Sequence, residues 1–147
     1  MVDMALREEL LVQPVEDYFT SLGYRMVREM QFFSKYIDLF GFNGGASSTV
    51  AVELKVRDWR RAIKQAKIYS LCANRVYIAM PYLVAKRAAK EMGSDCIGLL
   101  AVHTPEHPGG WRVDELIAAS ESPRKREDFA SRLVDSCKVA GERDNEC

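Results

Sequence analysis

Two apolar runs joined by a short polar loop constrain this chain more than any other feature. Residues 36–42 and 49–56 are rich in β-branched and aromatic side chains, which favour β-strands. The loop between them, residues 43–48, consists of Asn-Gly-Gly-Ala-Ser-Ser and is typical of a flexible hairpin connection. We therefore expect two neighbouring strands that pair through this loop.

Three charged residues interrupt the two predicted strands. Asp38 lies in the first strand, and Glu53 and Lys55 lie in the second. Because side chains alternate along a strand, Glu53 and Lys55 should share one face. A hairpin would bring Asp38 beside them. Two carboxylates are hard oxygen donors for a divalent cation, and the lysine would face a phosphate or a metal-bound water.

The spacing of these residues resembles a known enzyme family. Asp38, Glu53-x-Lys55 and the later Gln65-x-x-x-Tyr69 are similar to the PD-(D/E)XK nuclease superfamily, nearest its RecB-type and archaeal Holliday-junction-resolvase branches. The likeness spans roughly residues 5–103, with Ile37 where the family name has proline. It implies an α/β fold: a mixed central β-sheet flanked by helices on both faces, with a restriction-endonuclease-like αβββαβ core extended by a further helix and strand.

The resemblance also implies an activity and a set of site residues. The expected activity is hydrolysis of phosphodiester bonds with Mg²⁺ or Mn²⁺, with DNA favoured over RNA, endonuclease over exonuclease action, and a role in repair, recombination or defence. The implied metal ligands are Asp38, Glu53, the backbone carbonyl of Leu54, and Glu8, and the implied catalytic residues are Asp38, Glu53, Lys55, Gln65 and Glu8.

Glu8 lies in a helix predicted for residues 4–22. On a helical wheel it falls near the middle of the apolar stripe, and an acid aimed inward needs a partner. The family's first helix often supplies an extra acid to the metal site. A solvated glutamate in a fraying first turn is the alternative.

Positive charge is concentrated directly after the second strand. The whole chain has 21 Lys and Arg against 21 Asp and Glu, so it does not coat nucleic acid through its net charge. Between residues 55 and 67, however, six cations face one acid, Asp58. The residues expected to contact nucleic acid are Arg57, Arg60, Arg61, Lys64, Lys67 and Tyr69. An ordinary solvated helix face is the alternative interpretation.

The remaining sequence predicts alternating helices and strands. Strands are expected over residues 24–33, 75–80, 96–102 and 111–118, and helices over 59–73 and 82–92. Residues 1–120 should form the core domain, and residues 121–147 a charged, helical tail that ends in disorder from 141. The tail could dock on the core, clamp nucleic acid or mediate dimers. His103 and His107 lie in a turn rich in proline and glycine, which disfavours a metal site.

Composition indicates a cytoplasmic protein. The four cysteines match no zinc pattern and favour reduced thiols. The N-terminus does not resemble a secretory leader, and no apolar run approaches membrane-spanning length, so no membrane partner is expected. A homodimer is left open. Two other functions are also kept: a catalytically silent nucleic-acid-binding or assembly module with the nuclease fold, and a structural salt-bridge network in an unrelated α/β protein.

Overall fold

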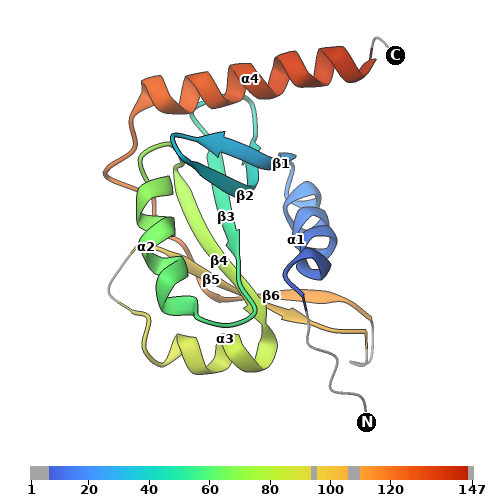
Figure 1. The fold of residues 1–147 in the computed structure, drawn as a ribbon, viewed down its shortest axis with the longest axis vertical. Helices are drawn as coiled ribbons and strands as arrows, with labels where there is room; N and C mark the ends of the chain where they lie inside the picture. Colours follow the sequence, from blue (N-terminus) through green and yellow to red (C-terminus); the bar gives the residue numbers. More distant parts are fainter. Residues whose placement is uncertain (1–6, 94–95, 106–109, 146–147) are drawn as a thin grey trace.

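The structure, a computed structural model, describes residues 7–93, 96–105 and 110–145, with the side chains of the last helix described as far as Val139. Within these ranges the chain forms a six-stranded mixed β-sheet with helices on both faces (Figure 1). The elements are α1 (Glu9–Ser21), β1 (Arg25–Phe32), β2 (Lys35–Phe42), β3 (Thr49–Leu54), α2 (Trp59–Tyr69), β4 (Arg75–Pro81), α3 (Tyr82–Ala89), β5 (Gly98–His103), β6 (Arg112–Ile117) and α4 (Glu127–Asn145).

The strands lie in the sheet in the order of the sequence, from β1 to β6. The β1–β2 and β2–β3 pairs are antiparallel, the β3–β4 and β4–β5 pairs are parallel, and β6 returns antiparallel to β5. Helices α2 and α3 make the crossovers that parallel strands require. The predicted α/β class is therefore confirmed, together with the mixed sheet, the hairpin loop over residues 43–48 and the edge strand β6.

Helix α1 covers one face of the sheet. Leu11, Val15 and Phe19 recur every four residues, so they form a single stripe on the helix, and all three are buried. They pack against strand residues that include Val52 and Leu100. Full burial of each such side chain stabilises the fold by about 1.5–3 kcal/mol.

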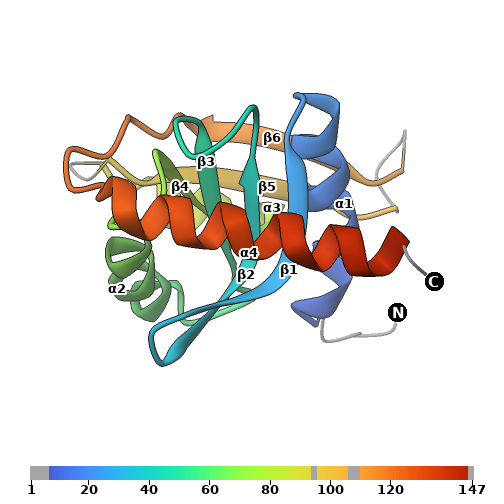
Figure 2. The same cartoon turned by 90° about the horizontal axis from the view of Figure 1, so that it is seen from above.

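Helices α2, α3 and α4 cover the opposite face. The inward positions of α2 and α3 are small, including Ala62, Ala66 and Ala85, which lets both helices approach the strands closely. Helix α4 contributes Leu133 and Val134 to the same core. Figure 2 shows α4 lying across β1 and β2. Of the three alternatives for the C-terminal segment, docking on the core is the one observed.

A buried lysine anchors the segment before α4. The Lys125 side chain is only 6% exposed, and its ammonium donates hydrogen bonds to the carbonyl oxygen of Ala46 and, at 3.0 Å, to Asn74 Oδ1. It also pairs with Glu127 at 3.0 Å. Ser122 Oγ donates to the carbonyl oxygen of Ser70 at 2.8 Å. The segment is thus fixed to the β2–β3 loop and to the end of α2.

Several predicted boundaries differ from the structure. Residues 141–145 continue α4 as a helix, so the predicted disorder from residue 141 is wrong for them, whereas 146–147 lie outside the described residues. The first helix begins at Glu9, and residues 4–6 of its predicted range are also outside. Helix α2 ends at Tyr69 because the chain turns there: the N–H groups of Cys72 and Ala73 both donate to the Tyr69 carbonyl.

Two further sequence expectations concern the histidines and the membrane. His103 ends β5 and lies 2.8 Å from Asp114 Oδ2, whereas His107 is outside the described residues.

No helix in the described part of the chain combines the length and the apolar character needed to cross a membrane.

Candidate active site

The pairing of β2 with β3 brings the two predicted acids together. Leu39 pairs with Val52, so Asp38 and Glu53 are the next residues beyond that pair on adjacent strands. Asp38 Oδ2 accepts a hydrogen bond from the Leu54 N–H at 2.8 Å. The register also places Glu53 close enough for the charge of Asp38 to raise the pKa of Glu53.

Burial favours the protonated form of both acids, most strongly of Glu53. Glu53 is only 5% exposed, and burial together with the nearby Asp38 raises its pKa to about 8, against the weaker opposing effects of Lys55 and a Tyr69 hydrogen bond. Burial also raises the pKa of Asp38, although the Leu54 N–H opposes this. The raised pKa favours a protonated Glu53 at neutral pH when no cation is bound.

Lys55 lies directly after β3 and faces the acids from the side of Glu8. Its Nζ is 3.8 Å from Glu8 Oε1, and both side chains are partly exposed, at 24% and 44%. Glu8 stands just before α1, one turn before the buried Leu11, and is partly solvated rather than buried. It nevertheless lies close enough for its charge to raise the pKa values of Asp38 and Glu53.

Helix α2 contributes a tyrosine and a glutamine to this region. The Tyr69 hydroxyl lies 3.1 Å from the Tyr36 carbonyl oxygen and 3.3 Å from Glu53 Oε1, and it can donate to either. Tyr69 is fully buried, so the expectation that it contacts nucleic acid is wrong; its hydroxyl orients Glu53 instead. Gln65 lies one helical turn earlier, and its Oε1 is buried with no hydrogen-bond partner among the residues the structure describes.

A cleft of about 450 Å³ opens beside the acids. It is lined by Glu8, Glu9, Val12, Arg28, Glu29, Asp38 and Leu54. Glu29 is exposed at this cleft and has a left-handed backbone, with φ of +54°, which nothing in the sequence signals. Arg28, which sequence reasoning missed, is held by two hydrogen bonds of 2.9 Å to Glu16 on α1. The cleft is therefore rich in carboxylates and reaches Asp38 from solvent.

The donor atoms at this site fit a hard divalent cation. Asp38 and Glu53 offer carboxylate oxygens, and the Leu54 carbonyl faces the β2 side because the Lys55 N–H is bonded to Ala79 on β4. Over the described ranges, no group of three or more His, Cys, Asp or Glu side chains is arranged to hold a metal. Water would complete the coordination shell of such a cation.

The predicted cations are displayed on and beside α2. Arg57, Arg61, Lys64 and Lys67 are exposed. Arg60 is also exposed, but it pairs with Glu91 at 2.7 Å and stacks on Trp59, so part of its charge is neutralised. Sequence reasoning missed the exposed cations of the neighbouring helix α3, Lys86, Arg87 and Lys90, although their clustered spacing could have signalled them. The Arg60–Glu91 pair joins the two helices.

Fold and site together define a mixed α/β protein with a carboxylate pair and a lysine at the end of a central strand. No family model matches the sequence, and no curated protein matches it. The fold is similar to that of SPO1766, a protein of unknown function from Silicibacter pomeroyi, with a TM-score of 0.64 and 17% sequence identity over 97% of this chain and 96% of that one. At this identity the likeness concerns the fold alone.

Proposed function

We propose that the chain is a divalent-metal-dependent nuclease that hydrolyses phosphodiester bonds, with DNA as the favoured substrate. The observation that carries this proposal is the placement of Asp38 and Glu53 at adjacent positions of paired strands, beside Lys55 and next to an open cleft. A purely structural role accounts poorly for this arrangement, because burying two acids costs stability unless they gain a ligand. The resemblance to the PD-(D/E)XK superfamily supports the same function.

Asp38, Glu53 and the Leu54 carbonyl would hold Mg²⁺ or Mn²⁺. Such a cation, when bound, neutralises phosphate charge and lowers the pKa of a coordinated water. Glu53, whose pKa is raised, must lose its proton when the cation binds, since only the carboxylate is a good ligand. Lys55 would then hold the negative charge that develops on the phosphate. Tyr69 orients the Glu53 carboxyl through its hydroxyl.

Cleavage by a lysine variant tests the proposal. Wild-type protein should cut plasmid or linear DNA with Mg²⁺ or Mn²⁺ and not in EDTA. Lys55→Ala should lower the cleavage rate by at least about 100-fold, because a charge aimed at the transition state is lost. Lys138→Ala, which removes an exposed cation from α4, is the matched control. Cleavage by Lys55→Ala at the wild-type rate would exclude this role for the lysine.

A catalytically silent nucleic-acid-binding module is the second candidate. Two observations favour it: no set of three acidic side chains forms within the described residues, and Glu53 keeps its proton at neutral pH. In that case the protein would bind DNA with a strong salt dependence but would not cut it with any divalent cation. The same cleavage assay, repeated at pH 8.5 so that Glu53 ionises, separates the two functions.

A further inference from the structure

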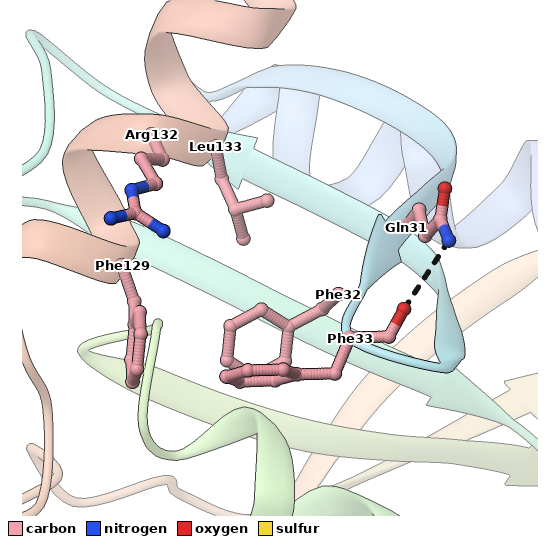
Figure 3. A pocket seen from close by; sticks show the side chains of 6 residues that line it. All are labelled: Gln31, Phe32, Phe33, Phe129, Arg132 and Leu133. Carbon is pink, nitrogen blue, oxygen red and sulfur yellow. Dashed lines mark hydrogen bonds between the residues drawn. The ribbon is translucent and has the colours of Figure 1, made fainter.

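The turn between β1 and β2 carries a cluster of aromatic rings that the proposed chemistry does not use. The Phe33 ring is centred 4.7 Å from that of Phe32 and 5.3 Å from that of Phe129 on α4. With Gln31, Arg132 and Leu133 these residues line a cavity of about 190 Å³, here called the hairpin cavity (Figure 3). Phe33 nevertheless remains 63% exposed, so most of its ring is available to a ligand.

The two-residue turn between Phe32 and Lys35 requires a left-handed backbone at Phe33, which is strained for so bulky a residue. Its φ is +56°, in the left-handed region that bulky residues rarely adopt and that costs roughly 1–2 kcal/mol. Glycine or asparagine would make the same turn more easily. The chain instead keeps a phenylalanine here and leaves its ring largely in water. This arrangement indicates that the ring itself has a use.

Cations surround the rings of the hairpin cavity. The Arg126 guanidinium lies 4.8 Å from the centre of the Phe129 ring and is partly neutralised by Asp128 at 3.3 Å, and Arg132 lines the cavity. Figure 3 shows the Arg132 side chain beside Phe129 and Leu133. A ligand that is planar, aromatic and attached to negative charge satisfies both features, since its ring stacks and its charge meets the guanidinium groups. A purely apolar segment would gain nothing from these cations.

The same hairpin leads directly to the acids. The Tyr36 carbonyl oxygen is bonded to the Tyr69 hydroxyl, which also contacts Glu53. From Phe33 to Asp38 is five residues, so the two lie at most roughly 17 Å apart along β2. The Tyr36 ring lies between them in sequence and is 61% exposed. An extended nucleic-acid strand a few nucleotides long would span this distance.

We propose that the hairpin cavity, together with the exposed ring of Tyr36, binds unpaired nucleobases of the strand whose phosphate reaches Asp38 and Glu53. The preferred substrate is then single-stranded or partly unpaired nucleic acid rather than blunt duplex. Stacking on phenylalanine is tolerant of sequence because every base has a π face, so no base preference is expected. The cavity as a base-binding site stands on its own, whereas the statement about the substrate rests on the proposed nuclease function.

Binding without cleavage tests the site. Fluorescence anisotropy in EDTA would compare a fluorescein-labelled 20-nucleotide thymidine oligomer, an abasic oligomer of equal length and a blunt 20-base-pair duplex. Phe33→Asn keeps a residue that tolerates the left-handed turn but removes the ring. It should weaken binding of the thymidine oligomer about 5- to 100-fold, because stacking on an aromatic side chain is lost. Binding of the abasic oligomer should stay within about twofold of wild type, since its phosphate contacts remain.

Two further variants separate stacking from other effects. Phe33→Tyr keeps an aromatic ring and should restore wild-type binding. Leu83→Asn removes an apolar side chain that is 69% exposed on α3 and should leave binding unchanged. Thermal unfolding of Phe33→Asn would show whether its fold is intact.

Three outcomes would overturn the proposal. These are wild-type binding of the thymidine oligomer by Phe33→Asn, an equal loss of the thymidine and abasic oligomers, or no binding of the thymidine oligomer by the wild-type protein. Absence of binding would overturn the base-binding site even if the protein cut duplex DNA with Mg²⁺, because cleavage tests only the nuclease proposal. Conversely, ring-dependent binding without any divalent-dependent cleavage would support the base site and exclude the nuclease.

Discussion

Asp38 Oδ2 accepts a hydrogen bond from the Leu54 N–H at 2.8 Å, which fixes a side chain of β2 against the end of β3. The contact lies beyond Leu39 and Val52, the last residues of this strand pair. Because the Asp38 carboxyl is held in this way, it faces Glu53 in a fixed position before any cation binds. Preorganisation of this kind lowers the cost of assembling a metal site.

Asp38→Asn should separate folding from metal binding. The asparagine oxygen can still accept the Leu54 N–H, and a partly buried charge is removed, so the free energy of unfolding should be unchanged or higher. Mn²⁺ affinity, measured by isothermal titration calorimetry, should fall by at least about tenfold because a carboxylate ligand is lost. Asp135→Asn on α4 is the matched control. Unchanged Mn²⁺ affinity would show that Asp38 is not a ligand.

Glu53 should make the fold less stable as the pH rises. Its pKa rises on folding from 4.5 to about 8, so between these values the folded state binds more protons than the unfolded state. By linkage, the wild-type free energy of unfolding should fall as pH rises through this window, by on the order of 3–5 kcal/mol for this group alone. The stabilisation is complete below the lower value and lost above the upper one.

Glu53→Gln imitates the protonated side chain and should remove this fall. The variant should therefore be more stable than wild type at pH 9 and similar to it at pH 5, as measured by urea denaturation across the pH range. Saturating Mg²⁺ should restore wild-type stability at high pH, since the cation replaces the proton. Parallel pH profiles for wild type and Glu53→Gln would contradict the raised pKa.

Tyr69→Phe tests whether the buried hydroxyl acts on Glu53. Its loss removes the one hydrogen bond that the hydroxyl donates, to the Tyr36 carbonyl or to Glu53 Oε1, which should cost about 1–3 kcal/mol of stability. The hydroxyl also lowers the pKa of Glu53, so the pH of half-maximal Mn²⁺ binding should move upward in the variant. Tyr77→Phe, whose hydroxyl bonds to Glu115 at 2.7 Å, is the control. A stability loss without a shifted pH profile would mean that Tyr69 is only a core residue.

The cations of α2 should act through the phosphate backbone. Arg61→Ala and Lys64→Ala should each weaken DNA binding at low salt and reduce the slope of log affinity against log salt by about one. The loss should be similar for all sequences, because phosphate contacts carry no sequence information. Lys138→Ala should change neither quantity. If the α2 variants keep the wild-type slope, the basic face is an ordinary solvated surface.

Local pattern was sufficient to predict most of the fold. The spacing of Leu11, Val15 and Phe19 marks α1, and the apolar runs mark the strands, because these signals depend only on the period of the element. Helix ends were less predictable. The end of α2 depends on a turn around the Tyr69 carbonyl, and the length of α4 depends on docking against the core, which are both tertiary effects.

The candidate site was predictable in its residue types and less so in its geometry. Alternation along a strand and a short loop were enough to suggest that Asp38 and Glu53 meet. Helical spacing predicted the face of α2 on which Tyr69 lies. It did not predict how deeply the Tyr69 side chain is buried. Nothing in the sequence indicated that Glu29 adopts a left-handed conformation beside the cleft, because that depends on the local bend of β1.

The buried ammonium of Lys125 has a consequence for how this protein can be shortened. A truncation after residue 120 would strip Ala46 and Asn74 of a donor and expose the apolar side chains that α4 covers on the β1–β2 hairpin. That hairpin carries Asp38. The segment after residue 120 is therefore part of the minimal folding unit, and a trimmed expression product should lose the geometry of the candidate site together with its solubility.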